Sequence, residues 1–485
     1  MLGKLIRNLL GTLRRTPAAA ANLTAPVASA LDVALSHQKS GRLDEAIELL
    51  QRLTVRAPRM AEAHFHLGDA VRARGDMARA AQHYQRAIDL DPNFAAAHSN
   101  LGNALRALGQ LDASIAAHQR AVKVCPDFAE AHHNLGIALF SVGRDVNQAA
   151  RSFERALELR PDYAEARFSR AQVLLACGDL ERGWKDYESR FDAGRGEHRV
   201  PHPVLPQPGW QGENLTGKSI LVWSEQGIGD QILFASLLPE LIERTRCCTL
   251  LCQPKLATLF ARSFPDAHVT AQINATDLAD AFDVQVAAGS AARWLRPTLA
   301  SFPNRPSYLV ADPQRIAYWR KRFAEIGDGL KVGFCWRSSL SKAERSFEYS
   351  SLSQWGPIFA VPGVHFVNLQ YDECRVELEQ ARSEFGVTLH HFLEVDMFDD
   401  LDETAALMKA LDLVISAQTA VSAQAAALGV PCWQMSCGAD WPALGAEHNP
   451  WYPTMKCFRR TWEQPWSVII EQIAGELQRV ARSHG

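Results

Sequence analysis

The sequence predicts a chain of two parts, an α-helical solenoid followed by an α/β region built on parallel sheets. The first part shows glycines that recur every 34 or 35 residues, a period typical of stacked two-helix units; they are Gly41, Gly75, Gly109, Gly143 and Gly178. After residue 217 this period ends, and short apolar runs alternate with helical segments. Such alternation indicates strands joined by helices, and therefore parallel sheets.

Composition excludes several classes of protein. The 485 residues include 51 basic and 54 acidic side chains, a net charge of −3 that lacks the basic footprint of a nucleic-acid-binding protein. We find no run approaching the roughly 20 apolar residues of a membrane helix. The ten cysteines show no metal-ligand spacing, so we expect reduced thiols in a cytoplasmic protein.

Residues 1–25 are predicted to form a basic amphipathic segment and a linker. Leu2, Leu5, Ile6 and Leu9 share one helical face, while basic residues such as Arg7 lie elsewhere. A docked or frayed terminal helix is one reading. Contact of residues 1–15 with an anionic membrane surface, which would make the protein peripheral at the inner membrane, is the alternative.

Residues 26–194 are predicted to form the helical array. Each central unit carries a Leu-Gly pair, as at Gly68, Gly102 and Gly136, followed by small residues and a closing proline. The glycines let the two helices of a unit approach closely, and the prolines end the second helix. This pattern resembles the tetratricopeptide repeat, whose arrays bind other proteins.

Asparagines occupy one inner-face slot of consecutive units, at Asn100 and Asn134, with Asn103 one turn further on. An amide both donates and accepts hydrogen bonds, so it can pair with a peptide group whatever the side chain. Arrays fused to O-GlcNAc transferases carry a similar ladder that holds acceptor polypeptide. Solvated polar residues on a helix are the other reading.

Residues 195–217, with four prolines, are predicted to be an extended linker. Beyond it we expect two series of strands separated by helices, which include 231–244, 402–411, 419–428 and a last helix, 466–482. The first series of strands is 219–223, 249–252, 269–271 and 284–287. The second series is 332–336, 364–368, 388–390, 411–416 and 431–435.

Four segments at strand ends are candidate sites, because ligands bind at the carboxyl ends of strands in open parallel sheets. The first is the loop with Gly227, Gly229 and Asp230; Asp230 is either a helix cap or a general base. The second holds Arg337 and Arg345, which fit a diphosphate or a sugar acid; a solvated basic loop is the other reading. The other two segments surround Gln370 and run from Ser416 to Ser422, where free amides of a helix start predict a phosphate cradle.

The segment 222–230 is similar to the opening motif of bacterial glycosyltransferases related to the lipopolysaccharide heptosyltransferases. The segments 411–431, 440–441 and 451–453 look like later motifs of the same family. The combination with repeats resembles fusions that include flagellin-modifying enzymes and, more distantly, O-GlcNAc transferases. The resemblance implies a GT-B fold, with an acceptor-side lobe at 218–315 and a nucleotide-sugar lobe at 316–485, whose last helix packs back on the first lobe.

The same resemblance implies roles for individual residues. Asp230 matches the proposed catalytic acid of the family, and the resemblance implies that neither a metal nor a cofactor is required. The residues implied to bind the donor are Gly227, Gly229, Arg337, Arg345, Gln370, Gln418, Thr419, Ala420 and Val421. The implied acceptor is a protein hydroxyl, with flagellin as a candidate, held by Asn100, Asn103 and Asn134.

Two positions depart from the family. Gln418 stands where an aspartate is usual, and Ala423 where a histidine is usual. A different donor, such as a CMP-linked nine-carbon acidic sugar whose carboxylate meets Arg337 and Arg345, would explain the changes. Loss of activity would explain them too, and would leave a repeat-based adaptor with a degenerate transferase region. A transferase acting on a lipid-linked glycan is a third reading.

Overall fold

The computed structural model describes residues 25–143, 145–193, 205–273, 282–338 and 348–484. Within them the chain divides into two compact units. The first contains the described residues up to Ser141 together with Asn147–Ala166, and the second contains Val142–Val146 and the described residues from Arg167 onward. The segment 1–15 and Arg345 lie outside the described residues.

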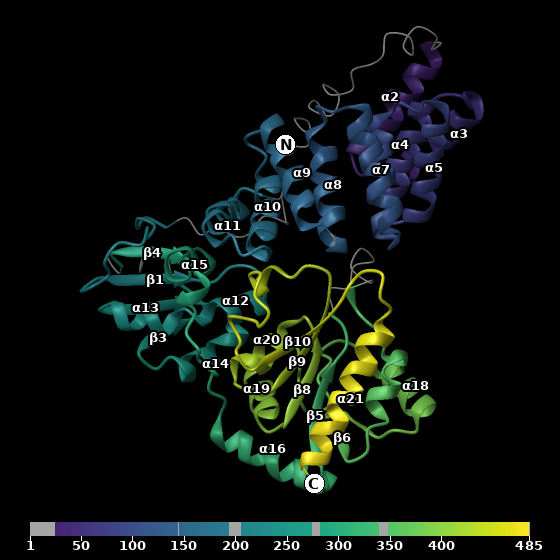
Figure 1. Cartoon of the computed structure of the whole chain (residues 1–485). Helices are drawn as coiled ribbons and strands as arrows, with labels where there is room; N and C mark the ends of the chain where they lie inside the picture. Colours follow the sequence, from purple (N-terminus) through teal and green to yellow (C-terminus); the bar gives the residue numbers. More distant parts are fainter. Residues whose placement is uncertain (1–24, 144, 194–204, 274–281, 339–347, 485) are drawn as a thin grey trace. The chain divides into compact units, whose positions relative to one another are not determined.

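Ten α-helices precede the first strand in the described part of the chain (Figure 1). They are α2 (Ala25–Lys39), α3 (Leu43–Arg56), α4 (Ala61–Ala73), α5 (Met77–Leu90), α6 (Ala95–Ala107), α7 (Leu111–Val124), α8 (Ala129–Val142), α9 (Val146–Leu159), α10 (Ala164–Ala176) and α11 (Leu180–Tyr187). A short 3-10 helix, η2 (Glu188–Phe191), follows directly. The helical solenoid that the glycine period predicts is therefore confirmed.

The repeated glycines have two different structural roles. Gly75 and Gly109 adopt positive φ, which ends the first helix of a unit in a conformation that favours glycine. Gly68, Gly102 and Gly136 lie instead against one ring each. A Cβ added at these three positions would come within 2.6 to 2.8 Å of the rings of Tyr84, His118 and Phe153, so glycine is required for close helix packing.

The second unit contains two parallel sheets. The four-stranded sheet has the order β3-β2-β1-β4, and the six-stranded sheet has the order β10-β9-β8-β5-β6-β7. The strands of the first are β1 (Ser219–Trp223), β2 (Cys247–Leu251), β3 (Ala267–Thr270) and β4 (Val284–Ala287). Those of the second are β5 (Leu330–Cys335), β6 (Val364–Asn368), β7 (Leu389–His390), β8 (Leu413–Ala417), β9 (Cys432–Cys437) and β10 (Met455–Arg460).

Both sheets reverse their strand order at one place, between β1 and β4 in the first and between β5 and β8 in the second. In open parallel sheets the crevice at the carboxyl ends of such strands is where ligands bind. Ile220 pairs with Val284, and Cys335 pairs with Ser416, across these two places. The loops that follow β1, β5 and β8 are therefore the ones the fold brings to candidate crevices.

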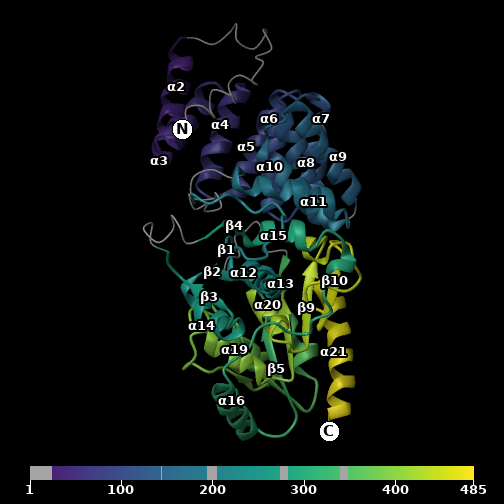
Figure 2. The ribbon, with the colours of Figure 1, turned by 90° about the vertical axis from the view of Figure 1, so that its left-hand side faces the viewer.

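Helices cover the sheets on both faces (Figures 1 and 2). In the first sheet region they are α12 (Ile228–Ala235), α13 (Leu238–Arg244), α14 (Pro254–Ser263) and α15 (Ala288–Leu295). The others are α16 (Pro313–Ile326), α17 (Gly356–Phe359), α18 (Arg375–Phe385), α19 (Leu401–Lys409), α20 (Ala420–Ala427) and α21 (Trp466–His484). The 3-10 turns described in this region are η5 (Leu299–Ser301), η7 (Leu352–Gln354) and η8 (Trp441–Ala443).

Three expectations about elements are corrected. The single helix expected over 231–244 is two helices, α12 and α13, and Pro239 lies in the first turn of the second. Strand β10 was not predicted. The last helix, α21, packs on strand β10 of the six-stranded sheet (Figure 2) and on helix α17, and not on the first sheet region. Its side chains Ile469, Ile473 and Leu477 are buried in the core around the six-stranded sheet.

The two sheet regions share one continuous core. Helix α12 of the first packs against α20 of the second. Arg262 on α14 donates two hydrogen bonds to the Asp402 carboxylate on α19, at 2.5 and 2.8 Å. Between them, the amides of Tyr308 and Leu309 both reach the Ala427 carbonyl at 3.0 Å. The sheets are therefore held in a defined arrangement with the starts of α12 and α20 close together.

Candidate functional site

The candidate site is the place where the N-terminal ends of α12 and α20 meet. A Cβ built on Gly229 would lie 3.7 Å from Ala420 Cα and 3.8 Å from Ala420 N, in open van der Waals contact. The loop after β1 and the loop after β8, which are far apart in sequence, are thus brought together. The glycine-containing loop at 227–230 and the expected phosphate cradle at 416–422 both contribute to this contact.

Asp230 lies in the first turn of α12 at this junction. Its Oδ2 accepts a hydrogen bond from the Gly227 amide at 3.3 Å, so the side chain also stabilises the start of its own helix. Burial raises the pKa of the carboxyl to about 6, and the bond from Gly227 opposes that shift. A carboxyl with this pKa exchanges protons near neutral pH, as a general base must.

The loop before α20 is less open than its sequence suggests. The Thr419 amide donates to Ser422 Oγ at 3.2 Å, and the Val421 amide donates to Thr419 Oγ1 at 3.3 Å. The expected set of free amides is therefore corrected, because two of them are used to cap the helix. The Ala420 nitrogen lies 3.8 Å from a Cβ built on Gly229.

Gln418 is exposed and donates a hydrogen bond of 2.6 Å to Asp440 Oδ1. The second oxygen of that carboxylate is buried without a hydrogen-bond partner in the described part of the chain. Burial raises the pKa of Asp440, and the bond from Gln418 opposes the rise. Ala423, the other departure from the family pattern, is buried on α20. A carboxylate therefore stands beside Gln418, although it comes from another loop.

Arg337 does not offer a free cation at the end of β5. Its guanidinium pairs with Asp372 and Glu377 and also donates to the Glu373 carbonyl. Hydrogen bonds to Glu377 and Asp372 raise its pKa. An anionic ligand would have to displace two carboxylates, so the expectation that Arg337 meets a phosphate or sugar acid finds no support in this geometry.

Gln370 is also bound within the protein. Its Nε2 donates to the Arg337 carbonyl at 3.0 Å and to Asp372 Oδ1 at 2.9 Å, and its Oε1 accepts from the Arg337 amide. The side chain is buried and ties the end of β6 to the end of β5. Gln370 lies at a strand end as predicted, and its polar atoms are hydrogen-bonded to residues of the neighbouring loops.

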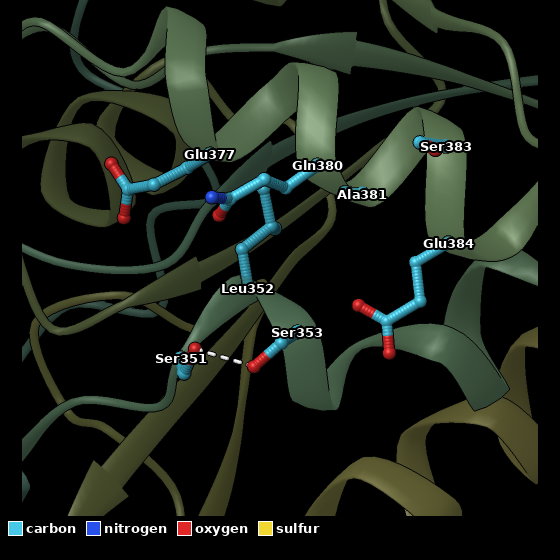
Figure 3. Close-up of a pocket in the computed structure, with 8 residues that line it drawn as sticks. All are labelled: Ser351, Leu352, Ser353, Glu377, Gln380, Ala381, Ser383 and Glu384. Atoms are coloured by element: carbon cyan, nitrogen blue, oxygen red, sulfur yellow. Dashed lines mark hydrogen bonds between the residues drawn. The ribbon is translucent and has the colours of Figure 1, made fainter.

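An open pocket of about 370 Å³ lies between η7 and α18 (Figure 3). It is lined by Ser351, Leu352, Ser353, Glu377, Gln380, Ala381, Ser383 and Glu384. Ser351 and Ser353 are hydrogen-bonded to each other at its edge, 2.7 Å apart. Two glutamates and no cation line it, which does not suit a phosphate, and neither Asp230 nor Thr419 contributes to it.

In the array, the asparagines join neighbouring repeats. Asn100 Nδ2 donates to Asp69 Oδ1 at 2.8 Å, and Asn134 Nδ2 donates to Ser99 Oγ at 3.1 Å. Asn103 is half-buried on the same helix as Asn100. The donor side of two amides is therefore used between repeats, which fixes their orientation and leaves the carbonyl side to meet a peptide.

Sequence reasoning missed a buried cluster next to the Asp230 loop. Arg190, in η2, donates to Glu225 Oε1 at 2.9 Å, and the two side chains are 0% and 1% exposed. The Tyr187 hydroxyl, on α11, is hydrogen-bonded to the side-chain amide group of Gln226. Arg190 belongs to no recognisable sequence motif, so only the fold could reveal this pairing.

The described residues offer neither a metal-binding cluster nor a membrane-spanning helix. No three His, Cys, Asp or Glu side chains gather closely enough there to hold a metal ion. Among the helices described, none combines the length and the apolar character needed to cross a bilayer.

Comparison with known families identifies the first part of the chain. One family model described as tetratricopeptide repeat matches residues 31–94 and 142–194, another matches residues 83–116, and a model described as TPR repeat matches residues 102–143. The chain contains tetratricopeptide repeats. Proteins use such repeats to bind other proteins, so repeat-mediated binding of a protein partner is a plausible role for the array.

A curated relative, Protein FlbA of Caulobacter vibrioides, is 36% identical over 332 residues, a match covering 65% of this chain and 55% of the relative. The chain thus spans about half the length of the relative it matches. Since the tetratricopeptide repeats lie within residues 31–194, which number 164, the similarity extends into the sheet-containing region.

Solved structures with similar repeats include a MamA RS-1 double mutant, at 17% identity and a TM-score of 0.32. That match covers 35% of this chain and 94% of the other. A TPR protein of Thermus thermophilus, TTC0263, is 21% identical with a TM-score of 0.31, covering 35% of this chain and 93% of its own.

Proposed function

We propose that this protein is a GT-B glycosyltransferase that moves a sugar from a nucleotide-sugar donor to a hydroxyl of a protein held by the repeats. In the reaction, the acceptor oxygen attacks the anomeric carbon of the sugar. The bond from that carbon to the nucleotide phosphate breaks, its electron pair leaves with the phosphate, and the hydroxyl proton passes to the Asp230 carboxylate.

The observation that carries this proposal is that Gly229, the residue before Asp230, lies against the start of α20. An α-helix start favours a phosphate, because its amides and dipole are positive. Ala420 N lies there, close to Gly229, only one residue from Asp230. A base with a pKa of about 6 would thus stand next to the site for a leaving phosphate.

The repeats supply the acceptor arm of the proposal. Asn100 and Asn134 are held by bonds to Asp69 and Ser99, so their carbonyl oxygens are oriented in advance and could accept from peptide amides. The family resemblance makes flagellin the first acceptor to test. It also makes a CMP-linked nine-carbon acidic sugar a donor to test beside a UDP-linked hexose.

The test is transfer to purified flagellin by the full chain, followed by intact-mass measurement. Asp230→Asn should lower kcat/KM by about 100-fold or more, the typical share of a general base, with donor affinity retained. Because the ionised form of Asp230 accumulates as the pH rises through about 6, the native rate should rise between pH 5 and pH 7.

Asp312→Asn is the matched control, because Asp312 caps α16 by accepting from the Gln314 and Arg315 amides and has no part in the site. An Asp230→Asn enzyme as active as this control would remove Asp230 from the mechanism. Transfer from neither donor class, under any condition in which the chain is folded, would remove the transferase assignment.

A second candidate function is a repeat-based adaptor without activity. It is favoured because several groups expected to bind the donor are already paired within the protein. Arg337 is neutralised by two carboxylates, and the Thr419 and Val421 amides are occupied. An adaptor would bind the acceptor through the array but bind no nucleotide. Calorimetric titration with CMP and UDP separates the two, since binding of either with an affinity that falls in a Gly229→Val variant favours the enzyme.

A further inference from the structure

The end of the helical array contacts the loop that carries Asp230. Helix α11 and η2 close the array, and both belong to the same compact unit as the sheets. Trp184 on α11 donates from Nε1 to the Arg296 carbonyl at 2.9 Å and is 1% exposed. We call the segment Leu180–Phe191 the cap.

Two side chains of the cap hold two consecutive residues of the loop. The Arg190 guanidinium binds Glu225 Oε1 through Nε and Nη2, at 3.2 and 2.9 Å. The Tyr187 hydroxyl lies 3.3 Å from Gln226 Oε1 and 3.1 Å from Gln226 Nε2. Both cap residues are buried, at 1% exposure each, so water does not compete for these bonds.

The loop needs this support because of its backbone. Gln226 has φ of +65°, one of two non-glycine residues with positive φ in the described chain. A left-handed conformation is costly for a residue with a Cβ, and it persists only where surrounding contacts impose it. The next residue, Gly227, supplies the amide that binds Asp230. The conformation of Gln226 therefore decides where that amide points.

Glu225 is also hydrogen-bonded to helix α15. Its Oε1 also accepts from the Gly289 amide at the start of α15, at 3.2 Å, and a Cβ at Gly289 would lie 2.6 Å from that oxygen. Arg190 Nη2 continues to Ser290 Oγ at 2.8 Å. The cap, the loop after β1 and the helix after β4 are thus joined at the place where the first sheet reverses its order.

We propose that Tyr187 and Arg190 are positioning residues, which hold residues 224–227 in the conformation that places the Asp230 carboxyl opposite Ala420. The cap, which belongs to the same compact unit as the sheets, is then one of the elements that shape the site. The catalytic part of this inference rests on the proposed function, whereas the positioning of the loop does not.

The test is hydrogen–deuterium exchange of the full chain, read at the peptide covering residues 224–230. Tyr187→Phe removes the hydroxyl and keeps the buried ring, so folding is preserved. Losing these bonds from a strained loop should speed exchange there by roughly five- to thirtyfold. Arg190→Lys, which keeps the charge beside Glu225 but lacks the planar fork, should do the same.

Repeating the measurement in a Gln226→Gly variant distinguishes a positioning role from a general loss of local stability. Glycine takes positive φ without strain, and Gln226→Gly also removes the partner of the Tyr187 hydroxyl. In that background Tyr187→Phe should change the exchange by less than about twofold, whereas independent effects would simply add. Tyr163→Phe, which removes a hydroxyl bonded to His133 in the array, is the matched control and should leave the 224–230 peptide unchanged.

Kinetics complete the experiment. Tyr187→Phe should lower kcat about tenfold with KM for the donor unchanged, because Asp230 is displaced and the start of α20 is not. Unchanged exchange at 224–230 in both Tyr187→Phe and Arg190→Lys overturns the positioning role, whatever the activity. Altered exchange in a chain whose native form transfers no sugar supports the positioning role and overturns the proposed function.

Discussion

Asp69 lies at the meeting point of two repeats and shows how single polar residues are used in the array. Its Oδ1 accepts from the Tyr84 hydroxyl at 2.7 Å and from Asn100 Nδ2 at 2.8 Å. Burial nevertheless raises its pKa to about 6, with those bonds and Arg72 opposing the shift. A raised carboxyl pKa means that folding favours the protonated form.

Asp69→Asn should therefore change how stability depends on pH. Relative to the unfolded chain, the native carboxyl contributes fully below pH 4 and loses its contribution as the pH rises through about 6, by up to roughly 3 kcal/mol for a shift of two pKa units. An asparagine oxygen can accept both bonds without ionising. The difference in opening free energy between variant and native chain should grow from pH 4 to pH 7.

Hydrogen exchange of peptides in α4 to α6, corrected for intrinsic rates at each pH, measures that difference. A constant difference across the range would mean that Asp69 titrates as it does in the unfolded chain. Tyr163→Phe, which alters a hydroxyl in a later repeat, gives the expected flat comparison.

At the scale of the helix, the three central repeats differ at one core position. Tyr84, His118 and Phe153 each face the glycine of the preceding helix. Neither ring nitrogen of His118 has a hydrogen-bond partner in the described residues, and the side chain is fully buried. Burial lowers its pKa to about 3, with Arg106 and His133 adding to the effect.

His118→Phe should stabilise helices α6 and α7. Phenylalanine fits the same slot beside Gly136, and removing two buried, unpaired nitrogens should gain about 1–3 kcal/mol at pH 7. Because the native histidine has a lowered pKa, the native chain loses stability as the pH falls below 6.5, and the variant lacks that loss. The gain should thus be larger at pH 5 than at pH 7.

Thermal unfolding at the two pH values, followed by circular dichroism at 222 nm, measures the gain. His132→Phe is the control, since His132 is not buried and its Nε2 meets the Pro126 carbonyl, so its loss should not stabilise the array. If the native chain were as stable as the His118→Phe variant at pH 5, the prediction would be wrong. The ring nitrogens of His118 would then be hydrogen-bonded to water.

At the scale of the whole molecule, the compact units do not follow the proline-rich linker that the sequence suggests as a boundary. The cap packs with the sheets, where the Trp184 ring meets Trp441 and Trp451 edge to face at 6.3 and 6.2 Å. Tyr187 and Phe234 join the same core. The last part of the predicted array at 26–194 thus completes the core of the second unit.

A fragment of residues 164–485 should therefore melt cooperatively, whereas 218–485 should melt about 10 °C lower or aggregate. Removing a buried tryptophan and a tyrosine costs several kcal/mol and exposes Trp451. Differential scanning calorimetry and light scattering compare the fragments. Equal melting temperatures would mean that the cap is only an attachment to the sheets.

The sequence by itself determined the features that repeat locally. A period of 34 residues predicts stacked helix pairs because each unit must bury the same face, and Gly68 could be matched to its role without coordinates. Strand and helix alternation likewise predicts parallel sheets, since a strand–helix–strand connection leaves little choice. Asp230 and Thr419 could be placed at strand ends for the same reason.

Only the tertiary structure decided which polar groups are free. Arg337 looks like an anion binder until Asp372 and Glu377, which are remote in sequence, neutralise it. Arg190 looks like a surface residue until Glu225 meets it in the core. Whether a charge is available depends on partners brought together by folding, and partners 35 or 40 residues away leave no local pattern to read.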